Sequence, residues 1–428
     1  MKNVELLMPA GNLEKLEYAI HYGANAVYLG VVDFSLRAMR KGSLITMDNL
    51  KEAVDLAHKL GAKAYVTINI FAFNNDIKQL EASLDRFKDA KPDAFIISDY
   101  GIFNLIRRYI PEIPIHISTQ TNTLNYESVK FWRDLGAERV ILARELAIKD
   151  IAEIRKQVPD VELESFVHGA QCVSFSGRCL LSDYFSKGER KANHGNCSQP
   201  CRWSYRLVEE TRPNEYLEIN QDNRGSHILS PKDLCLVHEI PQLIEAGIDS
   251  FKVEGRTKSL YYVSAVAKAY RQAIDDVLKN PSADLEKYFI ELQKVGNRGY
   301  TKGFALGDNN GESYSYDISK GLAGADFLCE FRSGHSEQEV LRSFANAQDD
   351  GEESHKNYHL VKIKNKMLVG DEVEIITPDE QFITKVEAVK NTDGEDLPLG
   401  NTNDDVYVKF SQSPKNPKYA LVRTVGIK

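Results

Sequence analysis

The chain has 428 residues, which excludes a single small module and allows two or three domains of about 150 residues each. Hydrophobic residues make up 42% and charged residues 27%, as in ordinary folded proteins. The formal net charge of −8 excludes the overall basic field of most nucleic-acid-binding proteins, so any contact with RNA requires a local basic patch. No signal-peptide pattern and no apolar run of about 20 residues is present, so we expect a cytoplasmic protein without membrane contact.

Short apolar runs alternate with amphipathic stretches through the first part of the chain. The predicted strands are Val4–Met8, Ala26–Leu29, Ala64–Ile70, Ala94–Ser98, Ile113–Ser118, Arg139–Leu142, Leu163–Val167 and Ser250–Val253. Helical spacing of apolar residues predicts helices at Leu13–His21, Met47–Leu60, Ile77–Lys88, Tyr126–Leu135 and Ile148–Gln157. The eight predicted strands, most of them separated by helices, indicate an α/β fold of the (β/α)₈ TIM-like barrel type rather than an open doubly wound sheet, which usually has fewer strands.

The eighth strand comes late in the chain. About eighty residues separate Val167 from Ser250, where a barrel needs only one loop and one helix, so we predict a cysteine-rich insert at about 170–240. After a long helix predicted at Ser259–Leu278, separated β segments follow: Tyr358–Ile363, Glu372–Thr377, Phe382–Val389 and Asp405–Phe410. We therefore predict a barrel domain at 1–314 and a small C-terminal β-barrel domain at 315–428, with a mobile acidic loop at 333–356 that carries no chemistry.

Reactive groups of such a barrel lie at the C-terminal ends of its strands, so the polar residues at the predicted strand ends are the candidate site residues. The candidates for catalysis are His168, Glu145 and Glu254, and those for binding an anionic ligand are Asn69, Gln120, Arg144, Lys252 and Arg256. Histidine is the usual proton shuttle near neutral pH, and two cations that flank a carboxylate on one side of a strand end suit an anion. The alternatives are solvated rim positions, a backbone-bonded histidine and a self-satisfied network of ion pairs.

Five of the six cysteines fall in one stretch: Cys172, Cys179, Cys197, Cys201 and Cys235. In a reducing compartment such thiols are ligands, catalytic groups or buried side chains rather than disulfides. Only the Cys197/Cys201 pair has the spacing of a zinc site, whereas a [4Fe-4S] cluster tolerates irregular spacing. Zinc and free thiols remain alternatives, but Ser204 stands where a radical-SAM motif would require its third cysteine.

The segments Glu164–Cys172 and Gly177–Ser182 resemble the signature of the collagenase-like peptidase family of unassigned catalytic type. Further segments are similar to that family: Pro9–Asn12, Ala26–Gly30, Cys197–Trp203, Ser230–Cys235 and Lys252–Arg256. The chain departs from the signature at Gln171, where the family has an aliphatic residue. For the closest members, the resemblance implies oxygen-independent formation of 5-hydroxyuridine at the tRNA wobble position, with an iron-sulfur cluster and prephenate as a small anionic co-substrate.

The resemblance also bears on the ligands and on alternative functions. We expect Cys172, Cys179, Cys197 and Cys235 to hold the cluster, with Cys201 as the alternative fourth ligand. Other members imply an rRNA cytidine hydroxylase, a peptidase, or a non-catalytic partner that works with a related paralogue. A peptidase finds little support, because the sequence has neither a His-Glu-x-x-His helix nor a Gly-x-Ser-x-Gly elbow.

The insert mixes basic and aromatic side chains in a way that suits contacts with tRNA. Phosphate contacts and base stacking would come from Lys187, Arg190, Lys191, Arg202, Arg206, Tyr184, Phe185, Trp203 and Tyr205. The alternative is a basic surface loop whose aromatic rings pack a small core of their own.

Overall fold

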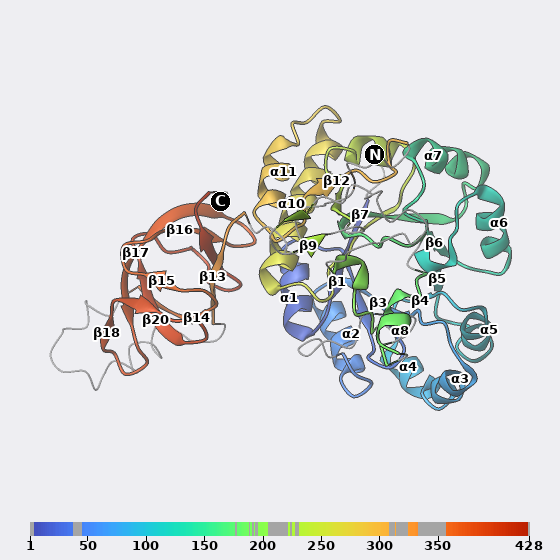
Figure 1. Cartoon of the computed structure of the whole chain (residues 1–428), viewed down its shortest axis with the longest axis horizontal. Coiled ribbons are helices and arrows are strands. Elements are labelled where there is room, and N and C mark those ends of the chain that lie inside the picture. Colours follow the sequence, from blue (N-terminus) through green and yellow to red (C-terminus); the bar gives the residue numbers. More distant parts are fainter. Residues whose placement is uncertain are drawn as a thin grey trace, which may run out of the picture. The chain divides into compact units, whose positions relative to one another are not determined.

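The computed structural model describes residues 4–36, 45–175, 178–187, 189–190, 192, 196–203, 221–222, 225–226, 231–307, 313, 324–332 and 357–426. The chain divides into two compact units, shown in Figure 1. The first comprises Met1–Leu292 and Gly296–Leu322, and the second comprises Gln293–Val295 and Ala323–Lys428. The acidic loop expected at 333–356 lies outside the described residues.

Eight parallel strands close the first unit into a barrel, which confirms the predicted fold class. They are β1 (Glu5–Ala10), β2 (Ala26–Gly30), β3 (Lys63–Ile68), β4 (Ala94–Ile97), β5 (Ile115–Ile117), β6 (Arg139–Ile141), β7 (Glu162–Ala170) and β11 (Ser250–Val253). Each strand pairs in parallel with the next, and β11 closes the ring because it pairs with both β7 and β1. Each predicted strand overlaps one of these eight.

Helices surround this barrel (Figure 1). They are α1 (Leu13–His21), α2 (Leu50–Lys59), α3 (Asn74–Glu81), α4 (Leu84–Ala90), α5 (Tyr100–Tyr109), α6 (Tyr126–Asp134), α7 (Ile148–Gln157), α9 (Ile240–Glu245), α10 (Leu260–Lys279) and α11 (Glu286–Gln293). Side-chain caps fix the residues at which several helices begin. The Asn12 side-chain oxygen, for example, accepts a hydrogen bond from the Lys15 backbone amide at 2.8 Å, at the start of α1. The single helix predicted at Ile77–Lys88 is instead α3 and α4, separated at Ser83, whose hydroxyl donates to the Gln79 carbonyl. Among the described residues, no helix has the length and apolarity that a membrane span requires.

The described part of the cysteine insert consists of short elements. These are α8 (Leu181–Phe185), the 3₁₀ turn η4 (Pro200–Arg202), β8 (Gln221–Asp222), β9 (Gly225–Ser226) and β10 (Asp233–Cys235). β10 pairs antiparallel with the end of β7, outside the closed ring, and β12 (Tyr300–Thr301) pairs with β10. The insert is thus anchored to the barrel beside β7.

The second unit is an antiparallel β-barrel, as predicted. Its ring consists of β16 (Glu372–Ile376), β21 (Leu421–Thr424), β13 (Phe327–Phe331), β14 (Tyr358–Ile363), β20 (Asp405–Phe410) and β17 (Gln381–Lys390), and pairing of β17 with β16 closes it. The short strands β15 (Met367–Leu368), β18 (Asp396–Leu397) and β19 (Leu399–Gly400) lie in its connections. Alternating residues of these strands, such as Val406 and Val408, form its apolar core.

Candidate active site

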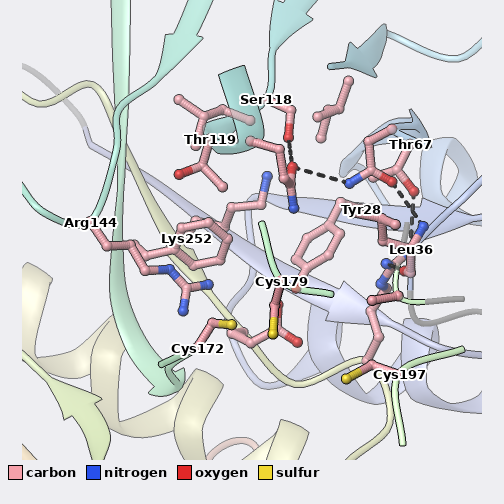
Figure 2. A pocket seen from close by; sticks show the side chains of 18 of the residues that line it. Tyr28, Leu36, Thr67, Ser118, Thr119, Arg144, Cys172, Cys179, Cys197 and Lys252 are labelled. Carbon is pink, nitrogen blue, oxygen red and sulfur yellow. Dashed lines mark hydrogen bonds between the residues drawn. The ribbon is translucent and has the colours of Figure 1, made fainter. Parts of the chain in front are cut away.

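A pocket opens at the C-terminal ends of the barrel strands, where a (β/α)₈ barrel is expected to carry its chemistry. We call it the mouth pocket. The predicted site residues that line it are Asn69, Gln120, Arg144, Lys252, Glu254, Arg256, Cys172, Cys179 and Cys197. The structure therefore brings together strand-end residues and insert cysteines that lie far apart in the sequence (Figure 2).

Four cysteines line this pocket: Cys172, Cys179, Cys197 and Cys201. The backbone amide of Leu181 donates to the Cys179 sulfur at 3.4 Å, and the amide of Gln199 donates to the Cys197 sulfur at 3.3 Å. Burial raises the pKa of the Cys201 thiol, the charge of Arg202 opposes this, and the other three cysteines of the pocket raise it further. The four sulfur atoms thus share one electrostatic environment.

Cys235, the predicted fourth ligand, does not line this pocket. It belongs to β10, whose antiparallel pairing places it opposite His168 of β7. Its side chain is 5% exposed, and its sulfur lies 3.8 Å from the Tyr270 hydroxyl. Burial raises the pKa of this thiol to about 12, as expected for an inert core cysteine.

His168 does not reach the mouth pocket either. The register between β11 and β7 shifts by one residue, so that Lys252 pairs with Phe166 but Val253 pairs with His168. This bulge breaks the alternation, and the His168 ring packs against Tyr262 and Tyr270 of α10, behind the barrel wall. Its side chain is buried, which lowers its pKa to about 3. The proton-shuttle role predicted for His168 is therefore not supported.

Two arginines line the mouth pocket. One nitrogen (Nη1) of Arg256 donates to the Ser35 hydroxyl at 2.6 Å and to the Thr67 hydroxyl at 3.0 Å, and the other (Nη2) donates to the Leu36 carbonyl. Arg144 donates to the Ala170 carbonyl at 2.9 Å, and its guanidinium lies 3.8 Å from the centre of the Phe166 ring. These contacts fix both guanidinium planes at the wall of the pocket.

The charge of Lys252 is balanced below the pocket. Its ammonium donates to the Glu164 carboxylate at 2.8 Å, and the same carboxylate accepts from Arg139 at 3.0 Å. Glu164 is fully buried, and burial lowers the pKa of Lys252. The ion-pair alternative therefore describes Lys252, which contributes little net charge to an anion site.

Neutral hydrogen-bonding groups also line the pocket, and a dashed line in Figure 2 marks the bond made by the Ser118 hydroxyl. The Gln120 carbonyl oxygen accepts from the Asn69 amide at 3.5 Å, from the Ser98 hydroxyl at 3.4 Å and from the Ser118 hydroxyl. Glu254 also lines the pocket, whereas Glu145 is half-buried and is not part of its lining. Of the three predicted catalytic residues, the structure thus places only Glu254 at the pocket.

Sequence reasoning missed the aromatic residue under Arg144. Phe166 lines the pocket two positions after Glu164, and both side chains face the barrel interior. Strand alternation from Glu164 was the available signal.

Comparison with known proteins identifies related chains. The family model of Peptidase family U32 matches residues 11–315, and that of the Peptidase family U32 C-terminal domain matches 345–423. A Haemophilus influenzae protein named tRNA hydroxylation protein P is 37% identical over 98% of this chain and 95% of its own length. The 23S rRNA 5-hydroxycytidine C2501 synthase of Escherichia coli is 34% identical over 74% of this chain and 47% of its own, and a collagenase of Porphyromonas gingivalis is 32% identical over 73% and 76%.

Proposed function

Because the chain belongs to peptidase family U32, we propose that it hydroxylates carbon 5 of uridine in tRNA, at the wobble position and without molecular oxygen. The observation that carries the proposal is the meeting of four cysteines with Arg144 and Arg256 in one pocket at the barrel mouth. Such a pocket combines ligands for a redox centre with groups that bind an anionic co-substrate. The tRNA hydroxylation protein of H. influenzae aligns along almost the whole of this chain, which supports tRNA as the substrate.

Four cysteines that line one pocket match the number of thiolates that a [4Fe-4S] cluster requires. In the described part of the chain, no three His, Cys, Asp or Glu side chains lie close enough together to hold one metal ion. Tetrahedral zinc requires sulfur atoms about 3.8 Å apart, because each Zn–S bond is about 2.3 Å long. In a [4Fe-4S] cluster each thiolate binds a different iron, so the four sulfurs lie farther apart. Cys172, Cys179, Cys197 and Cys201 would therefore hold the cluster, which supplies electron transfer when bound.

The remaining pocket residues would bind and orient the substrates. Two fixed guanidinium groups suit a dicarboxylate such as prephenate, since each places a positive charge at the pocket wall that can attract one carboxylate. Glu254 supplies a carboxylate at the pocket wall that can hold a proton near the target base. Asn69 and Gln120 offer amide groups that match the polar edge of a uracil ring.

The part of the basic and aromatic patch that the structure describes is accessible to RNA. Tyr184 is 77% exposed and Trp203 is 43% exposed, although Phe185 packs against both rings. Lys187 and Arg190 are also exposed. The predicted contacts Lys191, Tyr205 and Arg206 lie outside the described residues.

Two other functions make different predictions. Hydroxylation of an rRNA cytidine uses the same pocket chemistry and is favoured by the relative named for that reaction. A peptidase would need an activated nucleophile, and the described lining of the mouth pocket contains no histidine that could serve as its base.

The test is mass spectrometry of tRNA and rRNA nucleosides from a deletion strain. We expect 5-hydroxyuridine and its derivatives to disappear and to return with the wild-type gene but not with Cys172→Ser. The matched control is Cys329→Ser, which alters a buried cysteine of the second unit and should restore the modification. Unchanged tRNA would overturn the proposal, and loss of rRNA 5-hydroxycytidine instead would establish the second candidate.

A further inference from the structure

A second cavity lies on the other side of the turn that carries Cys201. We call it the outer pocket; its lining includes Arg202, Trp203, Lys258, Asn297 and Arg298, and its volume is about 260 Å³, several times that of a water molecule. The turn η4 separates the two cavities, since Pro200 and Cys201 line the mouth pocket whereas Arg202 and Trp203 line the outer one. A ligand in the outer pocket would therefore lie next to the candidate active site.

Three cations, Arg202, Lys258 and Arg298, line the outer pocket, and its described lining contains no Asp or Glu. Of the three cations in its lining, Arg298 donates to the buried carboxylate of Asp233, and the Lys258 ammonium lies 3.8 Å from the same carboxylate. Lys258 also donates to the Gly296 carbonyl at 3.0 Å, and Arg202 donates to the Gln199 side-chain oxygen at 2.8 Å. Among the described residues, Asp233 is thus the acidic partner of Arg298 and Lys258, and Glu254 of the mouth pocket is a further negative neighbour of Lys258.

The cations are close enough to act on one another. Burial lowers the pKa of Lys258, the charge of Asp233 opposes this, and the charges of Arg298 and Arg202 lower it further. A bound anion would relieve this repulsion. The chemistry of the pocket therefore selects a negatively charged ligand.

An aromatic ring stands beside these charges. Trp203 lines the outer pocket with 43% of its surface exposed, and its ring centre lies 5.7 Å from that of Phe185. A carboxylate ligand needs no such partner, whereas a nucleotide of single-stranded RNA presents a phosphate and a base together.

We propose that the outer pocket binds a backbone phosphate of the substrate RNA next to the target uridine, with Trp203 stacked on a neighbouring base. This deepens the proposed function and rests on it, because RNA must be the substrate. With the phosphate held beyond η4, the adjacent nucleotide lies beside the mouth pocket.

The test measures binding of a fluorescent anticodon stem-loop RNA to the full chain over a series of salt concentrations. Loss of one phosphate contact lowers the slope of log K against log[salt] by about 0.7 for single strands. We expect this decrease in Lys258→Gln and in Arg202→Gln, with Lys258→Arg close to wild type. Trp203→Leu should weaken binding about tenfold without changing the slope, because it removes stacking and no charge.

The matched control is Lys59→Gln. Lys59 is exposed in the last turn of α2, at the opposite end of the barrel from the mouth, and should keep the wild-type slope. Thermal denaturation and iron content verify that each variant is folded and loaded, and Arg202→Gln decides the matter if Lys258→Gln does not fold. If wild-type protein hydroxylates the RNA but the folded variants retain its slope, the phosphate site is refuted and the proposed function stands. If wild-type protein neither binds nor hydroxylates the RNA, both fail.

Discussion

Replacement of single cysteines tests the assignment of Cys201 rather than Cys235 to the cluster. Cys201 lines the mouth pocket with Cys172, Cys179 and Cys197, whereas Cys235 is buried against Tyr270. Cys201→Ala removes one of four ligands, so we expect iron to fall from about four atoms per chain to almost none. Cys235→Ala should retain the wild-type iron content.

The structure also sets the cost of Cys235→Ala in stability. The substitution removes one buried sulfur atom, which corresponds to about 1 kcal/mol for a small cavity. The Tyr270 hydroxyl still donates to the Val167 carbonyl at 2.8 Å, whereas the buried Val237 amide loses a weak hydrogen bond to the Cys235 sulfur. The variant should therefore fold, with slightly lower thermal stability.

The assay is iron and acid-labile sulfide content after anaerobic purification, together with the absorption near about 400 nm that iron-sulfur charge transfer produces. Cys329→Ala serves as the control for loss of a buried cysteine remote from the pocket, since Cys329 lies in the core of the second unit. Loss of iron from Cys235→Ala together with full iron in Cys201→Ala would refute the assignment.

Three further predictions concern charge and proton binding. Glu164→Gln should lower the free energy of unfolding by about 3–5 kcal/mol, because it leaves the buried Lys252 without its carboxylate. The control is Glu162→Gln, since the Glu162 side chain is 42% exposed. In urea denaturation this control should lose no more than about 1 kcal/mol. Since burial lowers the pKa of His168 to about 3, the unfolded chain takes up a proton below about pH 6.5 that the folded chain does not. This proton uptake lowers the free energy of unfolding by about 2 kcal/mol between pH 7 and pH 5. His168→Gln should remove this loss of stability and retain activity. If the pH dependence of unfolding is the same in the variant, the burial argument is contradicted. Arg256→Lys should reduce hydroxylation tenfold or more at limiting prephenate with iron content unchanged, because an ammonium lacks the guanidinium fork, and wild-type product levels in a complemented strain would exclude the anion-binding role.

The sequence by itself determined the two folds and the rim of the site. Strand and helix periodicities are local, so eight apolar runs and the helices between them were enough to predict the barrel. The candidate site residues at the strand ends followed from the predicted barrel. Alternation along the last strand correctly placed Lys252, Glu254 and Arg256 on the side that faces the pocket, because side-chain direction along a strand is a local property.

The tertiary structure decided which of these residues meet. Cys235 precedes the last barrel strand by 15 residues, yet it pairs with β7, more than sixty residues earlier, and this pairing places it in the core. A one-residue bulge likewise turns His168 from the mouth toward α10. Long-range strand pairing and bulges depend on how distant segments pack together, and no local pattern of residues encodes that packing.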